Sequence, residues 1–304
     1  MTRETPDITP TAQGGTLEPV RTGLLLALVG TACLYGLLVA DAYQDVPGLV
    51  RQTWRAQDAV TLVALGLLVV ADVRAGRGSF AAHIVRTGLL AWVAYCYAHL
   101  AVAVPFNPMF LLYVTALALS AFGLLDGLLR VDVTATAAAF TRTPRRAAGW
   151  FLTIAGVGIA GLWLSDIALG LTGGTPANLH LAGLPNPTWV LDLAWIIPWA
   201  LGAALMLRRG HPAGPLVTGV LLVMLTVLSA AMLATTPFAA AAGLADDPVV
   251  GPQLVAFTVV FTILGAVEVW LLARGRRRMG NVPPGWARPS WWPDAGPGRR
   301  PTGR

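Results

Sequence analysis

Long apolar runs separated by short polar stretches dominate the chain. Each run contains about 20 or more predominantly apolar residues, enough for an α-helix to cross a hydrocarbon core of about 30 Å. The pattern therefore predicts an all-α, polytopic integral membrane protein, a bundle of about eight transmembrane helices. The predicted spans are Val20–Ala40, Pro47–Val73, Ile84–Val104, Pro108–Leu129, Ala148–Leu171, Thr188–Leu207, Pro212–Thr235 and Val249–Ala273.

The composition agrees with this fold class and excludes several chemistries. Hydrophobic residues make up 56% of the 304 residues and charged residues only 12%, whereas soluble chains average about 25% charged residues. All 21 basic residues are arginine, and the sequence contains no lysine. Without lysine the chain cannot form a Walker A phosphate loop, or a Schiff base with pyridoxal phosphate or retinal.

The arginines lie on one side of the predicted bundle. Nineteen of the 21 fall on the side of the two tails and of the second, fourth and sixth connections, whereas Arg51 and Arg55 fall on the other side. Because basic residues stay on the cytoplasmic side of a membrane, we expect a cell (plasma) membrane protein with both termini cytoplasmic. The alternative is a signal peptide over Gly23–Val39, but this apolar stretch is long and acidic residues precede it.

Two polar tails flank the span region, which we place at residues 20–274. Residues 1–19 and 275–304 are rich in Pro and Gly and cannot bury a core, so we expect disordered cytoplasmic tails. After the last span comes a basic run, Arg274, Arg276, Arg277 and Arg278. The run fixes topology in one interpretation and contacts anionic lipid in the other. We expect the lipid bilayer as a partner of the chain. We expect no nucleic acid as a partner.

An ionisable residue inside a span is costly and is a functional candidate by default. In the second span, Arg51, Arg55 and Asp58 occur at i, i+4 and i+7 and share one helix face if the helix starts at Pro47. Gln57 lies beside them. One interpretation places Asp58 inside the bundle with Arg55 as its partner. The other places both arginines in an outer loop and makes Asp58 the helix N-cap.

Further polar residues map to the same outer third of the bundle. His99 is the only one of the four histidines within a predicted span, close to Asn107 in the next turn and to Tyr113 in the next helix. Asp166 ends the fifth span, and Asp192 lies one turn inside the sixth, before a proline that is expected to kink the helix. The candidate ligand or proton-binding residues are therefore Arg51, Arg55, Gln57, Asp58, His99, Asn107, Tyr113, Asp166 and Asp192.

The acids on the cytoplasmic side each have an arginine within reach. Asp126 has Arg130 at i+4, Asp72 is close to Arg74, and Glu268 precedes the basic run. Such pairs are typical of helix surfaces near a membrane interface. We therefore assign these acids no functional role.

The chain contains none of the enzyme motifs that we sought. A zinc site needs about three ligands rich in histidine, but only His99 and His180 fall on the outer side. No G-x-S-x-G nucleophile elbow occurs. Cys33 and Cys96 both fall inside spans, where we expect buried thiols that pack between helices. We expect no metal and no cofactor, and the catalytic residues, if any, are unknown.

Short internal repeats raise the question of a duplication. The first and fifth spans both close with Gly-Leu-x-x-x-Asp, at residues 36–41 and 161–166. A four-plus-four parallel duplication would explain this. Chance identity in so apolar an alphabet is the other interpretation.

Acids spread over several helices, without a nucleophile or metal set, favour a small-solute or proton-coupled permease or ligand-binding bundle. In this hypothesis Asp58, Asp192 or His99 carries the proton. An intramembrane enzyme acting on a lipid or isoprenoid substrate is one alternative, and a non-catalytic subunit of a membrane complex is another. Substrate-dependent proton flux, a bound metal or a stoichiometric protein partner would distinguish the three.

Overall fold

The computed structural model describes residues 17–44, 46–133, 144–176 and 186–276. Within these ranges eight helical stretches are long and apolar enough to cross a membrane. The helices are α1 (Leu17–Leu38), α2 (Gly48–Gly76), α3 (Phe80–Ala103), α4 (Phe110–Leu129), α6 (Arg145–Leu171), α7 (Pro187–Leu191), the π-helical segment η3 (Asp192–Ile196), α8 (Ile197–Arg208), α9 (Gly214–Ala241) and α10 (Val250–Arg276). The continuous run from α7 through α8 forms one of the eight stretches.

The observed helix ends lie within four residues of the predicted ones, with one exception. α9 continues six residues beyond the predicted end at Thr235 and includes Pro237. α3 starts at Phe80 because Ser79 caps it, accepting a hydrogen bond from the amide of Ala82. This earlier start brings His83 into the helix, so the prediction that only one histidine lies in a span is wrong.

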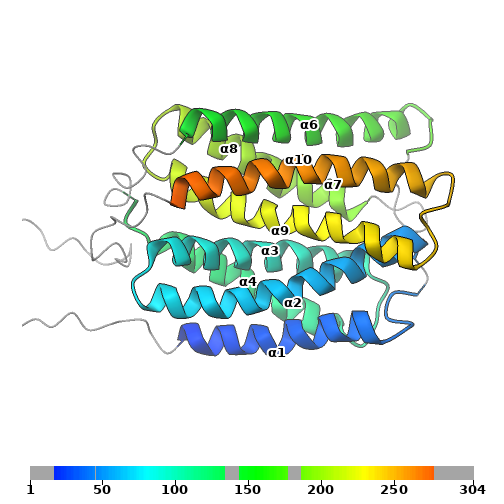
Figure 1. The fold of residues 1–304 in the computed structure, drawn as a ribbon, viewed down its shortest axis with the longest axis horizontal. Coiled ribbons are helices and arrows are strands. Elements are labelled where there is room, and N and C mark those ends of the chain that lie inside the picture. The colour runs from blue at the N-terminus through cyan, green and yellow to red at the C-terminus, as the bar shows by residue number, and fades with distance from the viewer. Residues whose placement is uncertain (1–16, 45, 134–143, 177–185, 277–304) are drawn as a thin grey trace, which may run out of the picture.

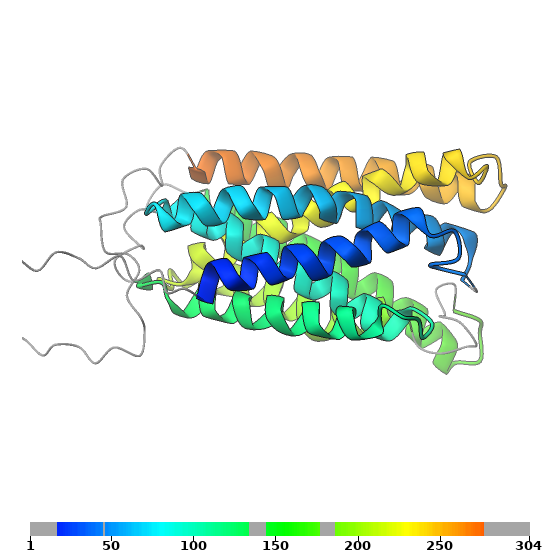
Figure 2. The same ribbon diagram turned by 90° about the horizontal axis from the view of Figure 1, so that it is seen from below.

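The helices lie side by side and alternate in direction, and both ends of the described chain lie at one end of the bundle (Figure 1). Figure 2 shows the same elongated bundle from below. Arg74, Arg77, Arg208 and Arg209 lie at or next to the turns at this end, which we call the basic end. Most residues of the predicted tails, 1–16 and 277–304, lie outside the described residues, including Arg277 and Arg278.

α3 forms the centre of the bundle. It packs against α2, α4, α7 and α9, and 83% of its most apolar stretch is buried, more than in any other described span. α9, which packs against α2, α3, α8 and α10, comes second with 61%. Side chains on α3 can therefore reach polar groups on either side of the bundle centre.

The outer surface of the bundle is apolar over most of its length. Large hydrophobic side chains on the peripheral helices are exposed, for example Val63, Phe122, Ile154 and Ile263, each at least 60%. Exposed apolar surface of this extent is unfavourable in water but matches the hydrocarbon core of a membrane. The surface therefore agrees with the multi-pass architecture that the sequence predicts.

The sixth span is irregular where the sequence contains a proline. The turn preceding Pro198 is π-helical, from Asp192 to Ile196. Proline has no amide N–H, and its ring clashes with the carbonyl four residues earlier, so a wider turn relieves the clash. This bulge carries Asp192, one of the predicted site residues, into the bundle.

Candidate functional site

Asp58 lies on the buried face of α2, together with Trp54, Thr61, Leu65 and Leu68. These positions recur every three or four residues and so share one side of the helix. The Asp58 side chain is only 2% exposed. It follows the first residue of α2 by ten positions, about 15 Å along the helix axis. Asp58 is therefore inside the bundle, far from the basic end, and its interpretation as a helix N-cap is wrong.

Tyr43 is the principal hydrogen-bond partner of Asp58. Its hydroxyl donates to Asp58 Oδ2 across 2.8 Å. Tyr43 lies in the connection between α1 and α2, is buried, and packs edge-on against Trp54 with ring centroids 5.3 Å apart. Burial, together with the adjacent Asp58, raises the pKa of Tyr43 well above its usual value. The phenol therefore remains protonated and can always act as the donor.

Gly36 leaves the space that the Asp58 carboxylate occupies. A Cβ atom at Gly36 would overlap Asp58 Oδ2 and would lie 2.6 Å from the Tyr43 hydroxyl oxygen. A Cβ atom at Gly30, on the same helix, would meet no atom within 4 Å. The missing side chain at position 36 is therefore a steric requirement of the site.

Neutral groups from α1, α3 and α4 enclose the carboxylate. Cys33 lies beside Asp58, and its Sγ is 3.6 Å from the Tyr97 hydroxyl. Tyr97 also donates to the Val29 carbonyl across 3.3 Å and packs against Tyr113, with ring centroids 5.9 Å apart. Both cysteines of the chain are buried free thiols, as expected. The described surroundings of Asp58 are thus mainly uncharged.

Arg51 and Arg55 do not form ion pairs with Asp58. Arg55 Nη2 donates to the Leu37 carbonyl across 2.8 Å, and Arg51 Nε donates to the Tyr43 carbonyl across 3.0 Å. Among the described residues, the ion pairs within 4.0 Å do not include Asp58. The predicted Arg55–Asp58 pair is therefore wrong. The last turn of α1 leaves carbonyls without intrahelical donors, and Arg55 binds one of them.

The other predicted residues of the first four helices lie around Asp58. The His99 ring is 6.4 Å from the Trp54 ring and is partly exposed. Gln57 accepts a weak hydrogen bond from the Cys96 thiol across 3.9 Å. Tyr113 is 1% exposed, and its hydroxyl lies near Asn107. The tertiary structure thus gathers into one region residues that the sequence separates by up to 62 positions, from 51 to 113.

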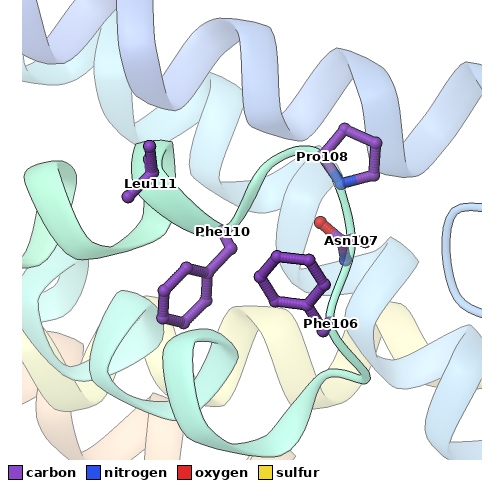
Figure 3. Close-up of a pocket in the computed structure, with 5 residues that line it drawn as sticks. All are labelled: Phe106, Asn107, Pro108, Phe110 and Leu111. Atoms are coloured by element: carbon purple, nitrogen blue, oxygen red, sulfur yellow. The ribbon is translucent and has the colours of Figure 1, made fainter.

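Asn107 also borders a surface hollow of about 560 Å³ at the α3–α4 connection (Figure 3). The other lining residues are Phe106, Pro108, Phe110 and Leu111. The Phe106 side chain is 88% exposed, and the lining is mainly apolar. This hollow therefore suits a hydrocarbon chain better than a polar solute, and we do not assign it to the Asp58 site.

Asp192 forms a second buried carboxylate site. Its two oxygens accept hydrogen bonds from the Tyr95 hydroxyl on α3 and from the Trp163 indole N–H on α6, each across 2.8 Å. Asp192 is 7% exposed. Asp166, which is also buried, lies three residues after Trp163 on α6. Two neutral donors thus hold Asp192 between α3, α6 and η3.

The Asp58 and Asp192 sites lie on opposite faces of α3. Tyr97 faces the Asp58 side and Tyr95 bonds to Asp192, and two helix positions differ by about 200° in direction. Among the described residues, the two carboxylates share no hydrogen-bond partner. The structure therefore separates Asp166 and Asp192 from the other predicted site residues.

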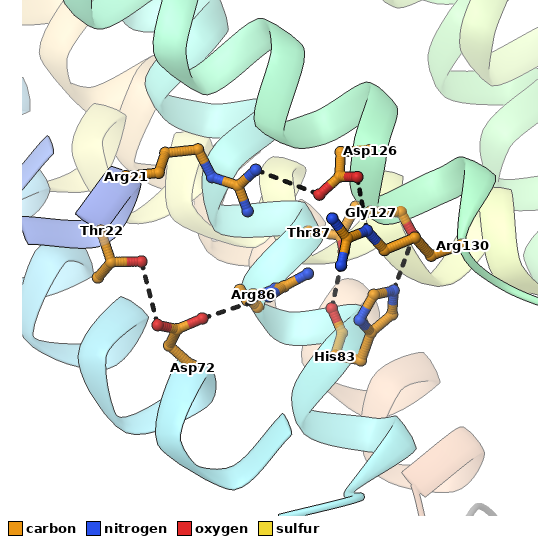
Figure 4. Close-up of polar contacts among 9 residues, drawn as sticks. All are labelled: Arg21, Thr22, Asp72, His83, Arg86, Thr87, Asp126, Gly127 and Arg130. Carbon is orange, nitrogen blue, oxygen red and sulfur yellow. Dashed lines mark hydrogen bonds and ion pairs between the residues drawn. The ribbon is translucent and has the colours of Figure 1, made fainter. Parts of the chain in front are cut away.

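A polar network near the basic end joins the first four helices (Figure 4). Arg86 on α3 binds Asp72 Oδ1 across 3.3 Å, and the Thr22 hydroxyl on α1 donates to Asp72 Oδ2 across 3.1 Å. The Arg86 side chain is only 3% exposed. Sequence reasoning paired Asp72 with Arg74, whereas the structure pairs Asp72 with Arg86, which lies inside α3.

The same network continues to α4. Asp126 accepts hydrogen bonds from Arg21 on α1 and from Arg130, the latter being the predicted i, i+4 pair. His83 Nε2 lies 2.7 Å from the Gly127 carbonyl oxygen, and the two form a hydrogen bond. These contacts pack α1, α3 and α4 together near the basic end.

Glu268 on α10 is a buried acid, and the prediction that it lies close to the basic run is wrong. Its side chain is 2% exposed and accepts a hydrogen bond from Ser229 on α9 across 3.0 Å. Arg274, in contrast, stacks on Trp270, with the guanidinium carbon 4.5 Å from the ring centroid. Within the described part of the chain, Glu268 therefore belongs to the α9–α10 interface rather than to the basic run.

Sequence reasoning also missed the hydrogen-bond donors of both buried carboxylates. Tyr43 lies in a short connection between predicted spans, and Tyr95 precedes Asp192 by 97 residues. The sequence indicated only that each buried aspartate needs a hydrogen-bond donor. It did not indicate which residue supplies that donor. Among the described residues, no group of three or more His, Cys, Asp or Glu side chains could hold a metal ion.

Comparisons with protein-family models, with curated proteins and with solved structures gave no match for this chain.

Proposed function

We propose that the chain is a multi-pass protein of the plasma membrane whose basic end faces the cytoplasm. The distribution of arginine supports this orientation, because in the sequence nineteen of the 21 basic residues fall on the side of that end. The apolar outer surface supports insertion into a bilayer. In this orientation the Asp58 site lies toward the outer side.

The function that we propose is proton-coupled transport of a small solute, with Asp58 as the proton carrier. The proposal depends on one observation. The Asp58 carboxylate is buried inside the bundle, and among the described residues it forms no ion pair with an arginine. A structural acid would be expected to keep such a partner, as Asp72 does with Arg86. Unpaired ionisable residues within spans mark proton and ion pathways in membrane proteins.

The geometry couples the proton on Asp58 to the packing of α1 against α2. A neutral carboxyl group tolerates the tight contact at Gly36 and the single bond from Tyr43. An ionised carboxylate carries a desolvation penalty of several kcal/mol and favours a state in which water reaches it. Loss of the proton therefore favours separation of α1 from α2, and a bound solute can exploit this change of population.

Proteoliposomes with trapped pyranine, a pH-sensitive dye, test the proposal. Mixtures of amino acids, of monosaccharides and of hydroxycarboxylates are added outside in turn, and luminal acidification is compared with protein-free vesicles. We expect at least one mixture to drive proton uptake by the wild-type protein. Asp58→Asn should abolish this uptake.

The matched control is Asp126→Asn, which removes a carboxylate from the polar network near the basic end and should retain proton uptake. Circular dichroism and gel filtration verify that both variants fold. Equal uptake by the wild type and Asp58→Asn, or uptake with none of the mixtures, would contradict proton coupling through Asp58.

A further inference from the structure

A second surface hollow, of about 370 Å³, lies where α6 ends and α7 begins. α6 ends at Leu171 and α7 starts at Pro187, so the hollow is at the end of the bundle opposite the basic end. Its volume falls within the range of about 300–1,000 Å³ that is typical of small-molecule sites. The described lining residues are Ile167, Gly170, Leu171, Gly174, Pro176 and Trp189.

Trp189 brings an unpaired hydrogen-bond donor to this lining. Its indole nitrogen Nε1 is buried and makes no hydrogen bond within the described residues. The side chain is 7% exposed, so bulk water does not satisfy the N–H group. Trp163 on α6, in contrast, donates its indole N–H to Asp192. Because buried polar groups are nearly always hydrogen-bonded, the unpaired indole in the wall of a hollow indicates that an occupant of the hollow supplies the acceptor.

The charges around the hollow determine which kind of acceptor fits. An indole N–H is a donor only, so the occupant must provide an acceptor atom. None of the described lining residues carries a charge. Two buried acids lie within one helical turn of lining residues, since Asp166 precedes Ile167 and Asp192 follows Trp189 by three positions. An anion here would face these acids without a cation in the described lining. A neutral carbonyl oxygen therefore fits better than a carboxylate or a phosphate.

The remainder of the described lining is apolar and continues onto the outer surface. Ile167, Leu171 and Pro176 supply hydrocarbon, and Leu171 is 84% exposed. Trp189 is the third residue of its span, so the hollow lies at the depth where the hydrocarbon core of a membrane meets the headgroups. The ester carbonyls of glycerolipids lie at this depth, and their acyl chains continue into the hydrocarbon core.

We propose that the hollow beside Trp189 binds the glycerol-ester region of a phospholipid from the bilayer. The indole N–H donates to an ester carbonyl oxygen, and the first carbons of the acyl chain contact Ile167 and Leu171. Tryptophans at membrane interfaces are common, but a buried one contacts lipid only if the lipid enters the hollow. This inference goes beyond the proposed function, because it assigns a lipid site that proton transport does not use.

Two phosphatidylcholines with chains of equal length test the carbonyl contact. The dimyristoyl lipid has ester linkages, whereas the di-O-tetradecyl lipid has ether linkages and no carbonyl group. Native mass spectrometry of the purified full chain, titrated with each lipid in detergent, gives the Kd of the first bound lipid. We expect the wild type to bind the ester lipid about five-fold more tightly, the effect of one hydrogen bond. Trp189→Phe keeps an aromatic ring without the N–H group and should bind both lipids equally.

The matched control is Trp150→Phe. Trp150 is 60% exposed near the start of α6 and stacks on Arg208, so this variant should keep the preference for the ester lipid. Ile167→Trp places a larger side chain in the hollow and should weaken the binding of both lipids. Circular dichroism and gel filtration verify that the three variants fold.

Two further measurements test the class of ligand and the position of the site. Sodium myristate, the free carboxylate with the same chain, should not compete with the ester lipid. An ester lipid with a photoreactive diazirine on its acyl chain should label residues 167–176. Equal affinity of the wild type for the ester and ether lipids, or an unchanged ester preference in Trp189→Phe, would overturn the lipid site. Competition by myristate, or labelling confined to other helices, would also overturn it.

Discussion

Replacing Gly36 with alanine tests the packing of α1 against the Asp58 carboxylate. The new methyl group would overlap Asp58 Oδ2 and lie 2.6 Å from the Tyr43 hydroxyl oxygen. Either the two polar groups or α1 must therefore move. Both Asp58 and Tyr43 are 2% exposed, so water cannot replace a hydrogen bond that is broken between them.

The expected change in the free energy of unfolding follows from three effects. Overpacking of a close-packed site costs about 1–3 kcal/mol. Breaking the Tyr43–Asp58 bond leaves buried polar groups unpaired, at a further cost of about 1–3 kcal/mol. Alanine is more favourable than glycine in a helix interior by about 1 kcal/mol. We therefore expect Gly36→Ala to lower the free energy of unfolding by about 3 kcal/mol.

Gly30→Ala is the matched control, because its methyl group meets no atom within 4 Å. Only helix propensity acts there, so stability should stay the same or rise by up to about 1 kcal/mol. The assay is equilibrium unfolding in mixed micelles by sodium dodecyl sulfate, followed by tryptophan fluorescence and circular dichroism.

A combined variant strengthens this test. Adding Tyr43→Phe to Gly36→Ala should change stability little further, because the alanine has already broken the bond and the two effects are not additive. Equal stability of Gly36→Ala and Gly30→Ala would refute the steric role of Gly36.

Three further predictions concern topology, the basic end and the α9–α10 connection. Reporter fusions after Arg146 should be cytoplasmic and fusions after Gly173 external, and a reversal of either would contradict the eight-span topology. Arg86→Leu should lower the free energy of unfolding by about 3–5 kcal/mol, because it leaves the Asp72 carboxylate without its ion pair. Arg130→Leu should lower it by only about 0–1 kcal/mol, because its pair with Asp126 is partly exposed. Equal losses of stability in micelle unfolding would contradict this contrast. Hydrogen bonds from the Val250 and Val249 amides, at the start of α10, lower the pKa of Asp247. Its stabilisation of the helix start is therefore present above the ordinary aspartate pKa and is lost as the pH falls through the lowered value. Asp247→Ala should therefore speed amide exchange in the first turn of α10 at neutral pH, and unchanged exchange would exclude this cap.

The amino-acid sequence by itself was sufficient to predict the eight helices and their order along the chain. A membrane-spanning helix makes its backbone hydrogen bonds within its own segment, so about 20 apolar residues are sufficient to predict it. The helix ends depend on local groups such as the Ser79 cap and are therefore less certain. The placement of Asp58 inside a helix that starts near Pro47 was likewise a local inference; the buried position is confirmed, but the Arg55 partner that came with it is wrong.

The partners of the buried carboxylates could be decided only by the tertiary structure. Asp192 takes its donors from Tyr95 and Trp163, which are 97 and 29 residues away. Arg55 lies one turn from Asp58 yet binds the Leu37 carbonyl, because the end of α1 packs beside it and offers an acceptor without a donor. Spacing along one helix gives the direction in which a side chain points. What it meets there depends on which neighbouring helix packs against that face.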